Sequence, residues 1–240
     1  MHAAGEALRR AASTCAVAAL GTAAAIASSV ALAQPPQLAD ADSVTWAFRA
    51  LFTVLVAVVV PVYIVKYGPS NFLWFSDIGL FGLFAALWLE HRLLGSMMAV
   101  AVLLPETLWL VSFASGAIAK GRGMSTLAMY MFDVRIPLYL RLLSGAFHFV
   151  LPPAAIWVVY RYGYDMRALA AQTLLAWIVL PATLWLTPAE KNVNWVRGFG
   201  HPPRTPLPLP LHFALVMLAY PLVIYWPTHW LLGTLFGPSP

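Results

Sequence analysis

Six apolar stretches, separated by short polar segments, organise the chain from residue 46 onward. Each is close to the ~20 residues that a helix needs to cross about 30 Å of hydrocarbon. They lie at about 46–65, 72–89, 94–115, 137–160, 168–187 and 211–234. We therefore predict an all-α protein, a polytopic membrane helix bundle with about six transmembrane helices.

Residues 1–33 have the pattern of a secretory signal peptide. Arg9 and Arg10 precede an Ala-rich apolar region at 11–30, and Ala-Leu-Ala at 31–33 matches a signal-peptidase site. The apolar region is long for a signal, so an uncleaved first membrane helix is the alternative. Either form places the residues that follow outside the cell membrane.

The basic residues favour the same orientation. Cleavage would leave a periplasmic linker at 34–45 and a six-helix transmembrane domain at 46–240. Loops on the inner side would then hold seven Lys or Arg, and those on the outer side four. The seven are Lys66, Lys120, Arg122, Arg135, Lys191, Arg197 and Arg204, and the four are Arg49, Arg92, Arg161 and Arg167. We expect a bacterial inner (cytoplasmic) membrane protein whose mature N-terminus is periplasmic.

Composition supports the membrane assignment and argues against nucleic-acid binding. The 240 residues are 61% hydrophobic and only 10% charged, whereas soluble domains contain about 25% charged residues. The net charge of +5 comes from single residues scattered over short loops, not from one basic face. Cys15 is the only cysteine, which excludes an intrachain disulfide.

The stretch Ile136 to Tyr160 is apolar enough to cross a bilayer, yet it carries two ionisable residues. In a helix, its polar and small residues fall on one stripe at i, i+3, i+4, i+7 and i+11. The stripe consists of Arg141, Ser144, Gly145, His148 and Pro152. Ionisable groups at membrane depth usually face the protein interior, so we expect this stripe to be buried.

Asp77 and Glu106, on two other apolar stretches, are the expected partners of this stripe. As candidate catalytic residues, His148 would be the general base, and Glu106 or Asp77 would orient it or relay a proton. Arg141 would bind an anionic headgroup or a developing charge. The structural alternative is that Arg141 neutralises one of the acids and that His148 forms a hydrogen bond between helices.

Two longer loops, at 116–136 and 188–210, are expected on the same side of the membrane as this cluster. They contribute Arg135, Asn192, Asn194 and Trp195 as candidate substrate-binding residues. Amides beside Gly and Pro also favour a structured turn. A role in closing the site and a role in binding a polar headgroup therefore both stay open.

Common catalytic and metal-binding motifs do not occur in the sequence. There is no GxSxG, HExxH or Walker motif, and no two histidines are four residues apart. We therefore predict no metal site and no cofactor.

Six segments carry a resemblance to a family of bacterial multi-pass proteins described only as membrane-associated. They are GPSNFLWFSDIGLF (68–81), residues 87–109, YMFDVRIPLYLR (130–141), FHFVLPP (147–153), RYGYD (161–165) and PAEKNVNWV (188–196). This resemblance implies a membrane bundle and no particular reaction. A much looser similarity is to the six-span androgen-induced hydrolase-like superfamily, whose members use a helix-borne histidine with a Thr or Cys nucleophile. Of those residues only His148 can be carried over.

Three functions are compatible with these features. The first is an intramembrane enzyme that acts on a lipid or isoprenoid from the cytoplasmic leaflet. The alternatives are a small proton-coupled transporter and a non-catalytic membrane scaffold or assembly factor. The expected partner is a membrane lipid, with no nucleic acid; the sequence does not identify a protein partner.

Overall fold

The computed structural model describes residues 43–119, 127–200 and 202–236. Regular structure in these residues is helical, apart from one bridge between Phe199 and Arg204. The principal helices are α2 (Ser43–Tyr67), α3 (Phe75–Leu89), α4 (Arg92–Ile118), α5 (Leu138–Tyr162), α6 (Ala168–Leu186), α7 (Leu209–Ala219) and α8 (Trp226–Phe236). The predicted all-α bundle is confirmed, whereas the proposed signal peptide lies outside the described residues.

Five helical segments of the described chain are long and apolar enough to cross a membrane. They are α2, α4, α5, α6 and the continuous segment Leu209–Phe236, in which a π-helix, η5 (Tyr220–Tyr225), joins α7 to α8. The chain is therefore a multi-pass membrane protein.

The expected span at 72–89 is shorter in the structure than the sequence predicts. A 3₁₀ helix, η1 (Pro69–Leu73), comes first, and α3 has only 15 residues. These rise about 22 Å, less than the full hydrocarbon thickness. The helix starts late because Trp74 is extended and because the Asn194 side chain binds Leu73 O and Phe75 N. Hydropathy alone does not register such a tertiary contact.

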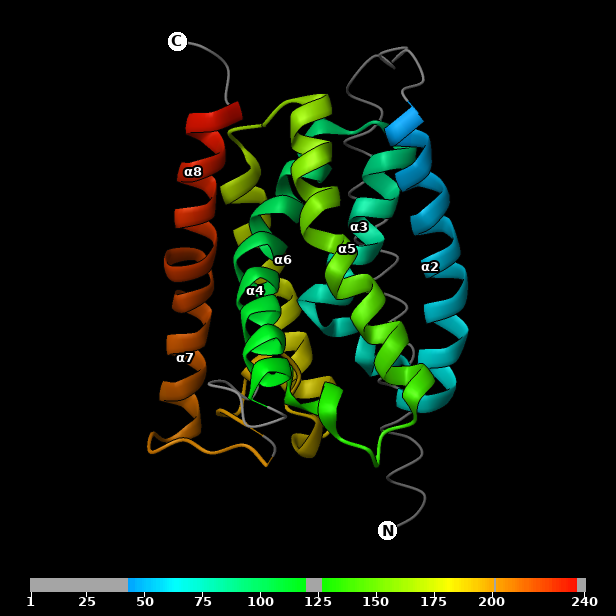
Figure 1. Ribbon diagram of the computed structural model, residues 1–240. Helices are drawn as coiled ribbons and strands as arrows, with labels where there is room; N and C mark the ends of the chain where they lie inside the picture. Colours follow the sequence, from blue (N-terminus) through cyan, green and yellow to red (C-terminus); the bar gives the residue numbers. More distant parts are fainter. Residues whose placement is uncertain (1–42, 120–126, 201, 237–240) are drawn as a thin grey trace.

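The helices run alternately up and down, so that α2 begins and α8 ends at the same end of the bundle (Figure 1). The opposite end, called the lower end here, holds the connections from α4 to α5 and from α6 to α7 (Figure 1). The two longer loops therefore lie together, as expected. At the upper end, Arg49 pairs with Glu90.

Close contact between α3 and α4 depends on glycine. A Cβ atom at Gly79 would lie 2.3 Å from Val102 Cγ1, and one at Gly82 would lie 2.2 Å from Met98 Sδ. Both are far below van der Waals contact, so a larger residue would displace the stiff Val102 side chain or its helix at Gly79, whereas at Gly82 the flexible Met98 side chain would have to move. The short α3 is thereby held directly against α4, with Asp77 in its first turn.

A hydrogen bond links α6 to α7 at a backbone carbonyl that Pro221 leaves free. Pro221 has no N–H to donate to the carbonyl of Met217, four residues earlier. That carbonyl accepts a hydrogen bond from Trp177 Nε1 of α6 at 3.1 Å. The backbone group freed by the proline therefore links α6 to α7 inside the membrane.

Candidate functional site

Glu106 and His148 form a direct pair between α4 and α5. Glu106 Oε2 lies 2.6 Å from His148 Nδ1, and the two residues are 3% and 9% exposed. Pro105 and Pro152 interrupt the regular hydrogen bonding of the same two helices nearby. The deep acid and the deep histidine that the sequence singles out are thus brought together.

His148 is held so that one ring nitrogen stays available. With an ionised Glu106, which can only accept, Nδ1 would donate its hydrogen to the carboxylate, and in a neutral imidazole Nε2 would carry the free lone pair. Among the described residues the hydrogen bond to Glu106 is the one that His148 forms through its side chain. Trp109 stacks on the imidazole at 4.4 Å and 15°, and the ring centroid of Phe147 lies 4.2 Å away. These rings fix the orientation of the base.

Asp77 lies close to this pair but does not join it. Its Oδ2 accepts a 3.3 Å hydrogen bond from Asn71 Nδ2, and its Oδ1 has no partner. The carboxylate is 2% exposed and near enough to Glu106 for their charges to repel. Three titratable groups on α3, α4 and α5 therefore share one interior.

The expected pairing of Arg141 with an acid is wrong. Arg141 Nη1 donates to Met131 O at 3.0 Å, and Nε is buried without a partner. The side chain belongs to the first turn of α5 and is bound there by the segment of η2 (Met129–Phe132), two turns from His148. Its guanidinium is therefore not neutralised by Asp77 or Glu106.

Three further residues complete the cluster, and the sequence had singled out neither Tyr130 nor Trp109. Tyr130 of η2 shares a 2.7 Å hydrogen bond with Ser144, one turn before His148 on the predicted stripe. Trp109, one turn after Glu106, is 6% exposed. A tryptophan inside a span instead of at its end is the one hint that the sequence offered for it.

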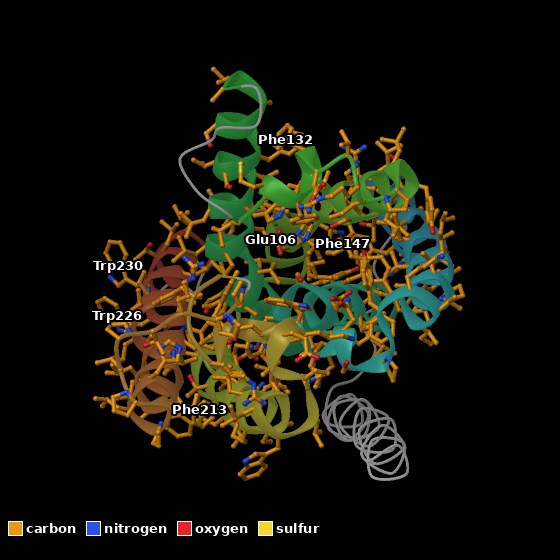
Figure 2. The ribbon with its side chains drawn as sticks, turned by 90° about the horizontal axis from the view of Figure 1, so that it is seen from below. Glu106, Phe132, Phe147, Phe213, Trp226 and Trp230 are labelled. Carbon is orange, nitrogen blue, oxygen red and sulfur yellow. The ribbon has the colours of Figure 1, made fainter. Side chains whose placement is uncertain are left out.

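Four of the five residues of the predicted stripe of α5 are buried, and Arg141 at its start is half-buried. Ser144, Gly145, His148 and Pro152 all face the protein. Figure 2, seen from below, shows Glu106 in the interior, whereas Trp226 and Trp230 of α8 project from the outer surface. The prediction that the polar stripe faces other helices and not lipid is confirmed.

The two loop asparagines have their hydrogen-bonding groups occupied by other parts of the chain. Asn192 Nδ2 donates to Gly198 O and Gly200 O, at 2.7 and 3.1 Å, and its Oδ1 accepts from Arg197 N at 3.0 Å. Asn194 donates to Leu73 O at 2.7 Å and accepts from Phe75 N at 3.1 Å. Both side chains are almost fully buried. We assign them to the structure of the loop.

The remaining two candidates lie at the surface of the lower end. Arg135 is exposed and pairs with Asp133 at 2.7 Å, which lowers the pKa of that carboxyl to about 2. Trp195 is half-buried, packs edge-on against Trp74 at 5.9 Å, and has a left-handed backbone. Neither residue contacts the Glu106–His148 pair.

Within the described part of the chain, no group of three or more His, Cys, Asp or Glu side chains is arranged to bind a metal ion. Comparison of the chain with protein-family models, curated proteins and solved structures finds no match. The resemblances noted from the sequence therefore stay expectations, and the function has to be inferred from the residues themselves.

Proposed function

We propose that the protein is an intramembrane enzyme that acts on a lipid or isoprenoid, with His148 as its general base. The observation that carries this proposal is the Glu106–His148 pair, in which the carboxylate holds Nδ1 and no other described residue bonds to the ring. Carboxylate-oriented histidines accept protons in this way, and such a base contributes about 10²–10⁴ to a rate.

Arg141 would hold the anionic part of the lipid. It lies in the first turn of α5, at the lower end of the bundle, and forms no ion pair with a described acid. Two helical turns separate it from His148, a rise of about 10 Å. A phosphate at Arg141 would thus leave the reactive part of the molecule at membrane depth.

The test is lipid profiling of a deletion strain complemented with variants. Wild-type protein and the His212→Gln variant should return the lipid profile to normal. His212 is the control because its hydrogen bond goes to the carbonyl of Trp195 and not to the Glu106–His148 pair. His148→Gln and Glu106→Gln should be inserted and folded but should not restore it. Restoration by His148→Gln would refute the proposal.

A proton-coupled transporter is the second candidate, and Asp77 favours it. A buried carboxylate with an unpartnered oxygen, close to a second acid, is a group that gains and loses protons readily when exposed to water. Deletion would then change the location of a molecule and not its chemistry. Asp77→Asn should abolish proton uptake in reconstituted vesicles loaded with a pH dye.

For the membrane, we propose the bacterial inner membrane with the lower end facing the cytoplasm. The distribution of Lys and Arg supports this orientation. Single cysteines in a Cys15→Ser background test it, one at Met166 in the upper loop and one at Phe199 in the lower loop. Both side chains are exposed. Impermeant maleimide added to intact spheroplasts should label only Met166→Cys; labelling of Phe199→Cys alone would reverse the orientation.

A further inference from the structure

The indole N–H of Trp109 is a buried donor without an acceptor. Leaving such a group unpaired is costly, and unsatisfied polar groups are rare in folded proteins. The ring cannot turn freely, because one face stacks on His148 and the other side contacts Phe113 at 5.6 Å and Phe149 at 5.9 Å. The donor is therefore held in place at the base.

A second donor lies beside it. Trp109 Nε1 is directed toward the hydroxyl of Tyr130 without reaching hydrogen-bond geometry. That hydroxyl shares a 2.7 Å hydrogen bond with Ser144 Oγ, in which either oxygen can donate, and when Ser144 donates the hydrogen of Tyr130 is free for a ligand. An N–H and two hydroxyl groups thus converge on the side of α5 that carries His148.

We propose that Trp109 Nε1–H and the Tyr130 hydroxyl donate hydrogen bonds to a carbonyl oxygen of the ligand, so that the site takes an acyl or keto lipid. This inference rests on the proposed enzyme function and names its substrate class. Both donors are neutral, and the nearby Glu106 carboxylate would repel a full anion. A phosphate therefore fits at Arg141, and a neutral carbonyl fits here.

Fixed donors of this kind act most strongly when the oxygen gains charge. If His148 Nε2 takes a proton from the carbon next to the carbonyl, the electron pair of the broken C–H bond forms the C=C bond of an enolate and the π pair of the carbonyl moves onto its oxygen. The two donors would stabilise that oxygen while Glu106 stabilises the imidazolium.

The experiment measures the carbonyl stretch of 2-tetradecanone, with and without ¹³C at the carbonyl, bound to the purified protein in detergent. We expect an isotope-sensitive band at lower frequency than for the ketone in detergent alone. Trp109→Phe keeps the stacked ring and removes the N–H, so this band should shift back or disappear. Trp185→Phe, at an exposed position of α6, is the matched control and should leave it unchanged.

Tyr130→Phe should produce a partial shift, and it decides the question if Trp109→Phe does not fold. Absence of the lower-frequency band in the wild type would overturn the inference, and so would a band that neither variant alters. His148→Gln tests the proposed base separately from the proposed carbonyl site, because it removes the base and leaves the donors Trp109 and Tyr130 in place. The band should persist in this variant even if His148 is not a base.

Discussion

The two asparagines of the 188–200 loop and the polar side chains between α3, α4 and α5 are all buried, but their polar atoms differ in how far they are paired. In the loop, Asn192 and Asn194 use their amide groups on backbone partners. In the interior, Asp77 Oδ1 and Trp109 Nε1 have no partner, whereas among the described residues of the loop Arg197 Nε is the one such atom. Satisfied groups define a shape, whereas unsatisfied ones are costly and are retained where a ligand or a proton can use them.

The largest effect is expected at Asn194. Asn194→Ala removes the bonds to Leu73 O and Phe75 N and places a Cβ-bearing, non-Asn residue at φ 53°. We expect a loss of about 3 kcal/mol of stability, measured as a lower thermal midpoint in detergent. Asn194→Gly removes the same bonds without the backbone strain and should lose about 1 kcal/mol less. Equal midpoints for the two variants would show that strain plays no part.

The next largest loss of stability is expected where α3 packs against α4. Gly79→Ala would bring a methyl group to 2.3 Å from Val102 Cγ1, so α3 must move. We expect a destabilisation of about 2 kcal/mol. The double variant Gly79→Ala with Val102→Ala provides space for the methyl group and should recover part of the loss. No recovery would mean that the contact does not determine the packing.

Asp77→Asn should stabilise the protein, unlike the two substitutions above. The substitution keeps an oxygen for Asn71 and removes a buried charge near Glu106. We expect the protein to be more stable by about 1 kcal/mol while it loses function, as is common for strained functional groups. Asn192→Asp, which puts a charge into the satisfied loop, is the reciprocal control and should destabilise. A less stable Asp77→Asn protein would place Asp77 among the structural residues.

The smallest effect separates two arginines at the lower end. Arg141→Gln should weaken binding of dodecyl phosphate about fivefold, or ~1 kcal/mol, because Arg141 forms no direct ion pair with a described acid and feels Asp133 only at longer range. Arg135→Gln should not change it, since Arg135 is exposed and already paired with Asp133. Titration followed by tryptophan fluorescence gives both constants, with inorganic phosphate as the headgroup-only probe. Equal losses for both variants would indicate binding to the surface charge alone.

Much of the fold follows from local pattern. Long apolar runs define five helices to within a few residues, and helical spacing alone places Ser144 and His148 on a buried stripe. These properties depend on residues close in sequence. The start of α3 does not, because Asn194 contacts Leu73 from 121 positions away.

The sequence identified several residues of the site but not which of them form hydrogen bonds with each other. Charge at membrane depth singled out Glu106 and His148, but which acid meets the histidine depends on how three separate helices are rotated against each other. In the structure, His148 bonds to Glu106, and Arg141 donates to the carbonyl of Met131. Trp109 was missed because an aromatic residue in a span looks the same in sequence whether it faces lipid or a histidine.

The wide turn at Tyr220–Tyr225 contains one residue more than an α-helical turn. Because the turn takes up that extra residue, the helix on either side of it keeps its phase. Removing one residue here would let the segment close into a regular helix, with Thr228 and Leu232 still packed inward. The same deletion at the start of α8 would instead turn everything after it by about 100°. A one-codon deletion in this stretch should therefore be tolerated far better than one in α8.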